Sequence, residues 1–165
     1  SIRILISAFA LFCLSGCGFQ PLYGDINETM PAAEENFTHI EIGNIPNREG
    51  QMLRNALIDR LHPGGRSDEV RYRLDISPIN ETLTDLDITK SADTTRAQLS
   101  LDTNITLKDA QTGEALLQRS LRSIASYNIL GSEFATRVSE KNTREHAIEE
   151  LARQIELQLA LYFKR

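Results

Sequence analysis

The chain contains no tryptophan, only two cysteines, and few aromatic residues of any kind, at 6% of the total. Cys13 lies within an N-terminal apolar run that we expect to be removed, so the exported domain would keep only Cys17 and could form no internal disulfide. Outside that run, no stretch approaches the roughly 18 apolar residues that a membrane-spanning helix needs. We therefore expect about 149 residues, enough for one domain with a single core, to be stabilised by packing alone.

Basic residues are also fewer than acidic residues. The chain carries 18 lysines and arginines against 23 aspartates and glutamates, a formal net charge of −5. A general nucleic-acid-binding domain normally presents a basic face, so the charge balance argues against nucleic acid as a partner.

Catalytic and metal-binding patterns are missing as well. The sequence has no Gly-x-Ser-x-Gly elbow, no phosphate-binding glycine loop and no cysteine cluster. Asp85 and Asp87, near Glu81, lack the glycine and the closing glutamate of a calcium loop, so a solvated hairpin arm is preferred to a cation site. The three histidines have no metal-ligand spacing and are interpreted as surface or helix-end residues: His39, His62 and His146. We predict a protein that is not an enzyme and has no metal or cofactor, a small periplasmic hydrolase being the disfavoured alternative.

The N-terminus carries the most informative motif. An apolar run of about eleven residues, Ile4 to Leu14, has the length of a signal-peptide core and is too short to span a bilayer. It is followed by Ser15-Gly16 and then Cys17, whose thiol can carry a thioether-linked diacylglycerol. We predict a lipoprotein signal peptide at residues 1–16 and a lipidated tether at 17–36. The alternative is an ordinary buried segment with an incidental cysteine.

Residues 37–165 are predicted to form a single domain that begins with a strand and a helix. A short strand is expected at residues 37–42, with Thr38, Ile40 and Ile42 on one face. A helix capped by Asn47 should follow and stop at Pro63-Gly64-Gly65. Its apolar positions are Met52, Leu53, Ala56, Leu57 and Leu61.

The hydrophobic period then changes to two, which is typical of half-buried strands. The first such strand covers residues 70–76 and is interrupted at Pro78; we expect it to continue in a hairpin arm that turns at residues 89–93. The clearest strand covers 99–108, and a tight turn at 109–113 leads into a returning strand with a phase slip near Ser123.

A long C-terminal helix completes the domain. Its apolar stripe has three- and four-residue spacing and consists of Ile148, Leu151, Ala152, Ile155, Leu159 and Tyr162. Phe134 and Val138 would extend the stripe upstream, but Lys141 and Glu145 then fall on its line, so we expect a kink or a fresh start near Asn142. The predicted fold class is α+β: a two-layer sandwich with two helices on one face of a mainly antiparallel four-stranded sheet, in the order βαβββα.

Basic residues gather on the predicted sheet and hairpin. They are Arg71, Arg73, Lys90, Arg96, Lys108, Arg119 and Arg122. Such a group can receive phosphates through charge-assisted hydrogen bonds, although ordinary strand solubility is the preferred interpretation from the residues alone.

Three blocks of sequence resemble one known family. Cys17-Gly18-Phe19-Gln20-Pro21-Leu22-Tyr23-Gly24 follows the lipoprotein signal, Arg54-Asn55-Ala56-Leu57-Ile58-Asp59-Arg60-Leu61 lies on the first helix, and Ser126-Tyr127-Asn128 precedes Phe134-Ala135 and Glu150-Leu151-Ala152-Arg153-Gln154-Ile155. Together they are similar to the lipopolysaccharide-assembly lipoproteins of the LptE family, particularly alphaproteobacterial members, over essentially the whole chain after the signal.

The resemblance implies two helices against a four-stranded sheet and a role without catalysis. It implies a one-to-one complex with the LptD β-barrel, in which the lipoprotein plugs the lumen and aids insertion of lipopolysaccharide (LPS) into the outer leaflet. It also implies anchoring to the periplasmic leaflet of the outer membrane, and Gly18 rather than aspartate after Cys17 agrees with that location. LPS binding through basic residues is a family property, and Lys90, Arg96 and Arg122 are our candidates for it. The alternative is a lipid-anchored periplasmic binding module or an accessory subunit of another envelope transport system.

Overall fold

A computed structural model of the chain describes residues 35–86, 95–129 and 131–164. The predicted signal peptide, Cys17, nearly all of the tether, Lys90 and the hairpin turn predicted at residues 89–93 lie outside the described residues. In the described ranges, no helix combines the length and the apolar character that a membrane span requires.

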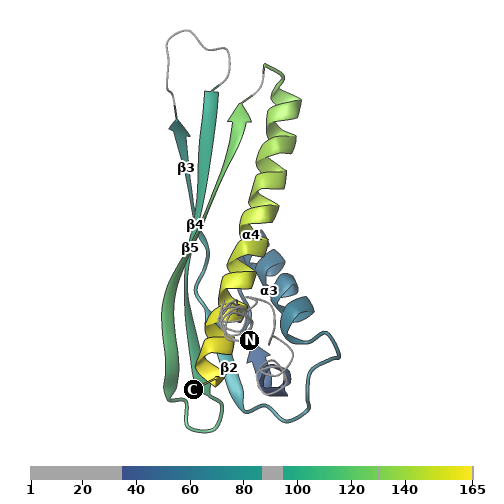
Figure 1. Cartoon of the computed structure of the whole chain (residues 1–165), viewed down its shortest axis with the longest axis vertical. Coiled ribbons are helices and arrows are strands. Elements are labelled where there is room, and N and C mark those ends of the chain that lie inside the picture. The colour runs from purple at the N-terminus through teal and green to yellow at the C-terminus, as the bar shows by residue number, and fades with distance from the viewer. Residues whose placement is uncertain (1–34, 87–94, 130, 165) are drawn as a thin grey trace, which may run out of the picture.

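The architecture is a two-layer α+β sandwich, which confirms the predicted class. Two helices pack on one face of a twisted sheet, and the longer helix runs nearly the full length of the molecule (Figure 1). The strands are β1 (Ile40–Ile42), β2 (Tyr72–Ile76), β3 (Asn80–Leu86), β4 (Thr95–Asp109) and β5 (Ala115–Ile129), and the helices are α3 (Asn47–Leu61) and α4 (Glu133–Phe163).

The long strand β4 organises the sheet. β2 and β3 pair antiparallel with successive parts of one side of β4, β5 pairs antiparallel with the other side, and β1 pairs parallel with β2. The described residues therefore form five strands where four were predicted. The extra one arises because the chain leaves the ladder at Pro78, which has no N–H to donate, so that β2 and β3 form one interrupted strand beside β4.

The beginning of the domain differs from the prediction. Residues 35–38 form a helical turn, and only Ile40–Ile42 are extended. Local hydrogen bonds explain the difference: the Thr38 hydroxyl donates to the Glu35 carbonyl at 2.8 Å, and the His39 N–H donates to the Asn36 carbonyl at 3.2 Å. These bonds give the backbone an alternative to the ladder.

The start of α3 was also predicted incorrectly. Pro46 occupies the N-cap position, and no side chain caps the helix. Asn47 instead adopts a left-handed φ of 70°, which asparagine tolerates better than most residues. The turn brings Ile45 so close to Gly50 that an added Cβ would lie 2.6 Å from Ile45 Cγ2, so only glycine fits there. The predicted stop is confirmed, because α3 ends at Leu61, before Pro63-Gly64-Gly65.

The β4–β5 hairpin is more regular than predicted. Its turn is formed as expected: Asp109 Oδ1 accepts hydrogen bonds from the N–H groups of Gln111 (2.9 Å) and Thr112 (2.7 Å), and Gly113 has a φ of 74°. The phase slip near Ser123 does not occur, since Ser123 pairs with Leu101 in an unbroken register. The irregularity is a bulge beside the turn, between Leu107 and Lys108.

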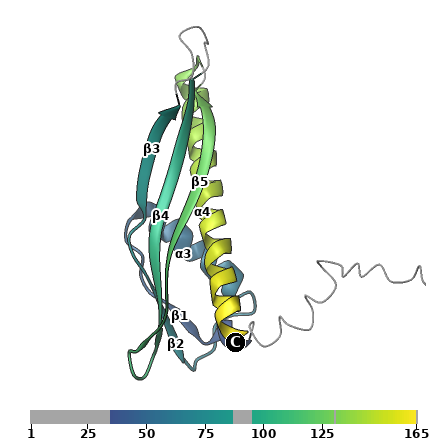
Figure 2. The same cartoon turned by 60° about the vertical axis from the view of Figure 1, so that its left-hand side comes forward.

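Helix α4 continues through Asn142 without a new start, so the predicted interruption is wrong. The apolar stripe ends there but the helix does not. Figure 2 shows the first turns of α4 extending beyond α3. On the line of the stripe, Lys141 and Glu145 keep partly exposed side chains (62% and 44%), and Lys141 Nζ lies 3.8 Å from Glu145 Oε1. Phe134, which was expected to extend the stripe, is 78% exposed.

The core lies between the sheet and the C-terminal half of α4. The buried residues of α4 are Ala147, Ile148, Leu151, Ala152, Ile155 and Leu159. They include every residue of the predicted stripe except Tyr162. Against them pack Leu99, Leu101, Ile105 and Leu107 from β4, together with Leu53, Leu57 and Leu61 from α3. One continuous cluster thus joins both helices to one face of the sheet.

Replacing Leu151 by alanine tests this arrangement. Leu151 is fully buried, so Leu151→Ala should lower the free energy of unfolding by about 2–5 kcal/mol, as other large-to-small core substitutions do. Leu157→Ala is the matched control, because Leu157 lies on the same helix and is half-exposed; its effect should stay within about 0.5 kcal/mol. Urea unfolding followed by circular dichroism measures both, and equal losses would contradict the assignment of the buried stripe.

Candidate functional site

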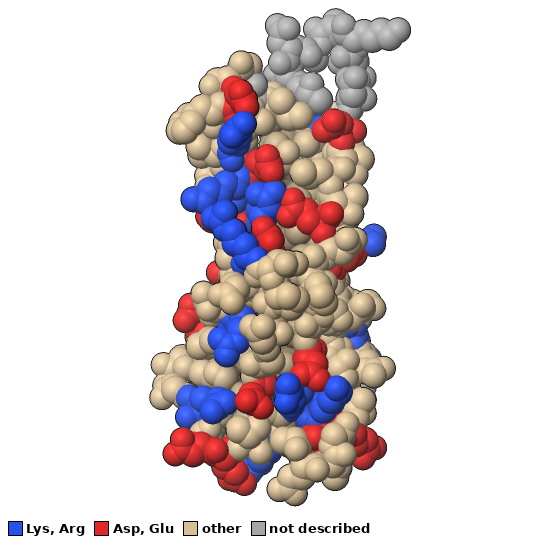
Figure 3. Space-filling model, turned by 180° about the vertical axis from the view of Figure 1, so that it is seen from behind, with Lys and Arg blue, Asp and Glu red and all other residues tan. Residues whose placement is uncertain are grey.

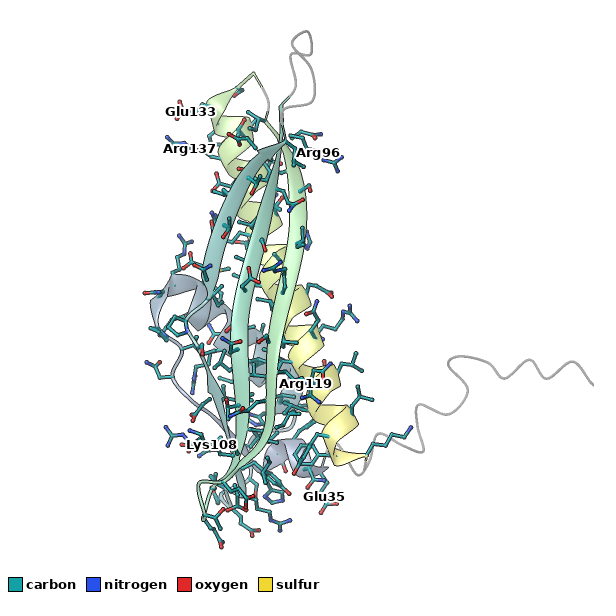
Figure 4. The ribbon with its side chains drawn as sticks, turned by 90° about the vertical axis from the view of Figure 1, so that its left-hand side faces the viewer. Glu35, Arg96, Lys108, Arg119, Glu133 and Arg137 are labelled. Carbon is teal, nitrogen blue, oxygen red and sulfur yellow. The ribbon has the colours of Figure 1, made fainter. Side chains whose placement is uncertain are left out.

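The two faces of the sheet differ sharply in chemistry. Along β4, the odd-numbered residues 97–107 are buried against the helices, whereas the described even-numbered side chains point to the opposite face. No described helix covers that second face, and the ribbon leaves it open over its whole length (Figure 4). We call it the open face.

Uncharged polar side chains dominate the open face. Cross-strand pairing places the following residues on it: Asn80, Thr82, Thr84, Gln98, Ser100, Asn104, Thr106, Gln118, Ser120, Ser126 and Asn128. Ile124 is its one markedly exposed large apolar residue, at 56%. Hydroxyl and amide groups both donate and accept hydrogen bonds, so this face suits a polar, hydrated partner.

Most charges on the open face are already paired. Arg122 Nε donates to Asp102, which lies directly opposite on β4. Asp75 contacts Lys108 Nζ at 2.8 Å and Arg73 Nε at 3.0 Å. These contacts hold the pKa of Asp75 below its ordinary value, and the hydrogen bond with Lys108 has the largest effect.

The candidate LPS-binding residues share the open face but do not converge. Arg96 lies opposite Asn128, and Arg122 lies opposite Asp102, six residues further along β4. At about 3.3 Å per residue, the two positions are about 20 Å apart. Among the described residues Arg96 has no carboxylate partner, whereas Arg122 does. Lys90 and the proposed lipidation site Cys17 lie outside the described residues.

The wider basic group does not form a single patch. Arg71 pairs with Glu69 beside the start of β2, and Arg119 lies opposite the buried Ile105, on the helix side of the sheet. On the face seen from behind, basic and acidic side chains are interspersed from end to end (Figure 3). The described members of the group are therefore spread over different parts of the sheet, and phosphate binding by them stays a prediction.

A charge network on the other face was missed by sequence reasoning. Arg144 of α4 donates two hydrogen bonds to Glu81 of β3, at 2.8 and 2.7 Å, and one to Glu140 at 2.7 Å. The hydrogen bonds with Glu81 are the main cause of a raised Arg144 pKa. Only the i,i+4 spacing of Glu140 and Arg144 was visible in the sequence, since the Glu81 contact spans 63 residues.

This network lies where the apolar core ends. Nearby, Tyr127 has a raised pKa, chiefly because it is buried and secondarily because Glu140 and Asp85 are close. The network therefore joins β3 to the part of α4 that precedes Ala147, in which no residue is buried.

His39 and His62 both lie within hydrogen-bonding distance of backbone carbonyl oxygens. His62 follows α3, and its Nε2 lies 3.1 Å from the carbonyl oxygens of both Phe37 and Ile40, while burial lowers its pKa. His39 Nδ1 lies 2.8 Å from the Glu69 carbonyl. Within the described ranges no three metal-ligating side chains come together, and Glu81 is engaged by Arg144.

Comparison with solved structures shows which class of protein has this fold. Similar structures include a putative lipoprotein from Caulobacter crescentus (TM-score 0.60, 22% identity, covering 79% of this chain and 93% of that one) and a minor lipoprotein from Acinetobacter baumannii (0.61, 19%, 76% and 94%). A rare lipoprotein B from Shewanella oneidensis is also similar (0.53, 12%, 72% and 89%). The fold is thus one found in bacterial lipoproteins.

The family follows from the sequence match. The family model LptE, described as lipopolysaccharide-assembly, matches residues 37–160. The chain therefore belongs to the LptE family, as its motifs suggested, and it is a member of a non-enzymatic group of LPS-assembly lipoproteins. A search of curated proteins found no significant match.

The pairing of Asp75 with Lys108 and Arg73 can be tested by titrating Asp75. Because the pKa of Asp75 is depressed, its pairing stabilises the fold above the ordinary aspartate pKa, and this contribution is lost as pH falls through the depressed value. Lys108→Met removes the main cause and should shift the Asp75 pKa upward, as measured by NMR titration of the carboxyl carbon. Lys141→Met, which removes an exposed lysine from α4, should leave it unchanged. An unaltered Asp75 pKa in Lys108→Met would disprove the assignment.

Proposed function

We propose that the protein is an outer-membrane lipoprotein that is acylated at Cys17, binds the LptD β-barrel one-to-one and occupies its lumen. In this role it aids assembly of the barrel and insertion of LPS into the outer leaflet. The LptE family match over residues 37–160 is the observation that carries the proposal. No chemistry is required of the protein beyond binding, and its only covalent group would be the acyl anchor.

The shape of the molecule supports a position along a barrel axis. Helix α4 has 31 residues, which at about 1.5 Å per residue is about 46 Å, comparable to a bilayer with its headgroups. Glu35 lies at one end of the molecule and Glu133 at the other (Figure 4). A chain anchored upstream of Glu35 would therefore reach from the periplasmic leaflet toward the outer one.

The open face supports a luminal partner. Barrel strands alternate lipid-facing and lumen-facing residues, so the lumen of a large barrel is polar and hydrated. The open face offers hydroxyl and amide groups, which can exchange hydrogen bonds to water for hydrogen bonds to a partner, and most of its charges are already paired locally.

Purification from membranes tests the partnership. A tagged full-length chain should bring down LptD in equal amount, as counted by native mass spectrometry, and its mature N-terminus should be an acylated Cys17. Depletion of the protein should lower surface LPS and leave LptD incompletely assembled. Normal LPS display and normal barrel levels after depletion would instead favour the alternative, a lipid-anchored module or accessory subunit serving another envelope transport system.

LPS binding through Lys90, Arg96 and Arg122 is a separate proposal. Arg96 has no carboxylate partner in the described part of the chain, whereas Arg122 must leave Asp102 to bind a phosphate. Arg96→Gln should therefore weaken LPS affinity more than Arg122→Gln, by about tenfold for one charge-assisted contact, and the triple neutral variant should lose most of it. Arg153→Gln, which removes an exposed arginine of α4, is the control in a fluorescence binding assay. Undiminished affinity in the triple variant would reject the three residues.

A further inference from the structure

The last strand of the sheet has one unpaired side. Among the described strands, β5 pairs with β4 alone. Which of its backbone groups face outward follows from the register. Asn104 of β4 accepts a hydrogen bond from the N–H of Ser77, so Asn104 points toward β2 and its neighbour Thr103 points toward β5. Thr103 pairs with Leu121, so the odd-numbered residues of β5 bond to β4 and the even-numbered residues point away.

The outward-pointing backbone groups form a long row. They belong to Gln118, Ser120, Arg122, Ile124, Ser126 and Asn128. From Gln118 to Asn128 the row covers eleven residues, about 33 Å from the first Cα to the last, and neither a proline nor a break in register interrupts it. Within the described chain, one of these groups has a partner: the Gln118 carbonyl accepts a hydrogen bond from Arg119 Nη1 at 2.8 Å. Unpaired edges of this length are templates for another strand unless they are protected.

A groove runs beside the lower part of this edge. It lies between β5 and α4, has a volume of about 220 Å³, and is lined by Leu117, Arg119, Gln158, Leu161 and Tyr162. Leu161 is 51% exposed, and Arg119 lies where β5 runs beside α4 (Figure 4). A strand added to β5 would place alternate side chains over this groove, where Leu117 and Leu161 can pack against an apolar residue.

The charge of the edge restricts the occupant further. The exposed Arg119 has no carboxylate partner among the described residues, whereas Arg122 is held by Asp102. β5 itself contains two arginines and no acidic residue. A second copy of β5 would therefore bring four guanidinium groups onto paired strands without supplying a counter-charge for Arg119.

We propose that the free edge of β5 binds an extended segment of another protein as an added strand. The segment carries an apolar side chain that fills the groove at Leu161 and a carboxylate that pairs with Arg119. In the free protein Arg119 covers the Gln118 carbonyl, and on binding it turns to the carboxylate while the incoming backbone N–H takes its place. The inference needs neither the barrel nor LPS, so it stands or falls separately from the proposed function.

Hydrogen exchange of single amides tests the proposal directly. The probes are two capped decapeptides of alternating valine and threonine, one with a central aspartate and one with asparagine in its place. Added to the full-length protein, the aspartate peptide should slow exchange at the even-numbered amides 118–128, which exchange fast in the free protein. It should bind about five to ten times more tightly than the asparagine peptide. Arg119→Gln should abolish that preference, and Arg137→Gln, which removes an exposed arginine of α4, should preserve it.

Three results would overturn the proposal. Fast exchange of the even-numbered amides at millimolar peptide would show that the edge accepts no strand. Equal binding of the two peptides to the unmodified protein would show that Arg119 selects no carboxylate. Protection of these amides that rises with protein concentration in the absence of peptide would identify the occupant as a second copy of the chain.

Discussion

The structure depends on burying one face of a twisted sheet beneath a single long helix. Leu151, Ala152 and Ile155 of α4 are fully buried against the odd-numbered row of β4, and α3 closes the remaining side of this core. Burial of apolar surface is the main favourable term in folding, and here it involves only one face of each strand. The other face is left to polar side chains, which is why the protein has a surface so rich in hydroxyl and amide groups.

The same constraint explains why apolar packing gives way to a charge network along the length of the molecule. α3 lines a pocket together with α4 residues from Asn142 to Glu149, whereas the apolar stripe of α4 ends near Ala147. Beyond it, the helix is held to the sheet by Arg144, which bridges Glu81 and Glu140. A partly buried charge network positions elements without adding much stability, because desolvation offsets most of the attraction. The elongated shape is thus supported by packing at one end and by hydrogen-bonded charges at the other.

Much of the fold was accessible from sequence because it is encoded locally. The two-residue period of β4 and the stripe from Ile148 to Leu159 each reflect one face of one element meeting the core, and both predictions were confirmed. The errors arose where two signals competed. Near Asn142 the charged residues on the line of the apolar stripe led us to predict a kink or a fresh start, although a helix can continue without an apolar stripe on intrinsic propensity and i,i+4 pairs. The helix cap was predicted at Asn47, one position after the observed cap Pro46, because the left-handed φ of Asn47 was not visible in the sequence.

The sequence by itself determined the family, the α+β class and the polar alternation of the strands, since motifs and periodicity are properties of neighbouring residues. It also brought together, as candidates, basic residues that the structure spaces apart: Arg96 and Arg122 share a face but sit at different levels of β4. Only the tertiary structure decided which charges are paired, which sheet face is open and which edge of β5 is free. Those properties depend on contacts between residues far apart in the chain, such as Glu81 with Arg144, and no local pattern encodes them.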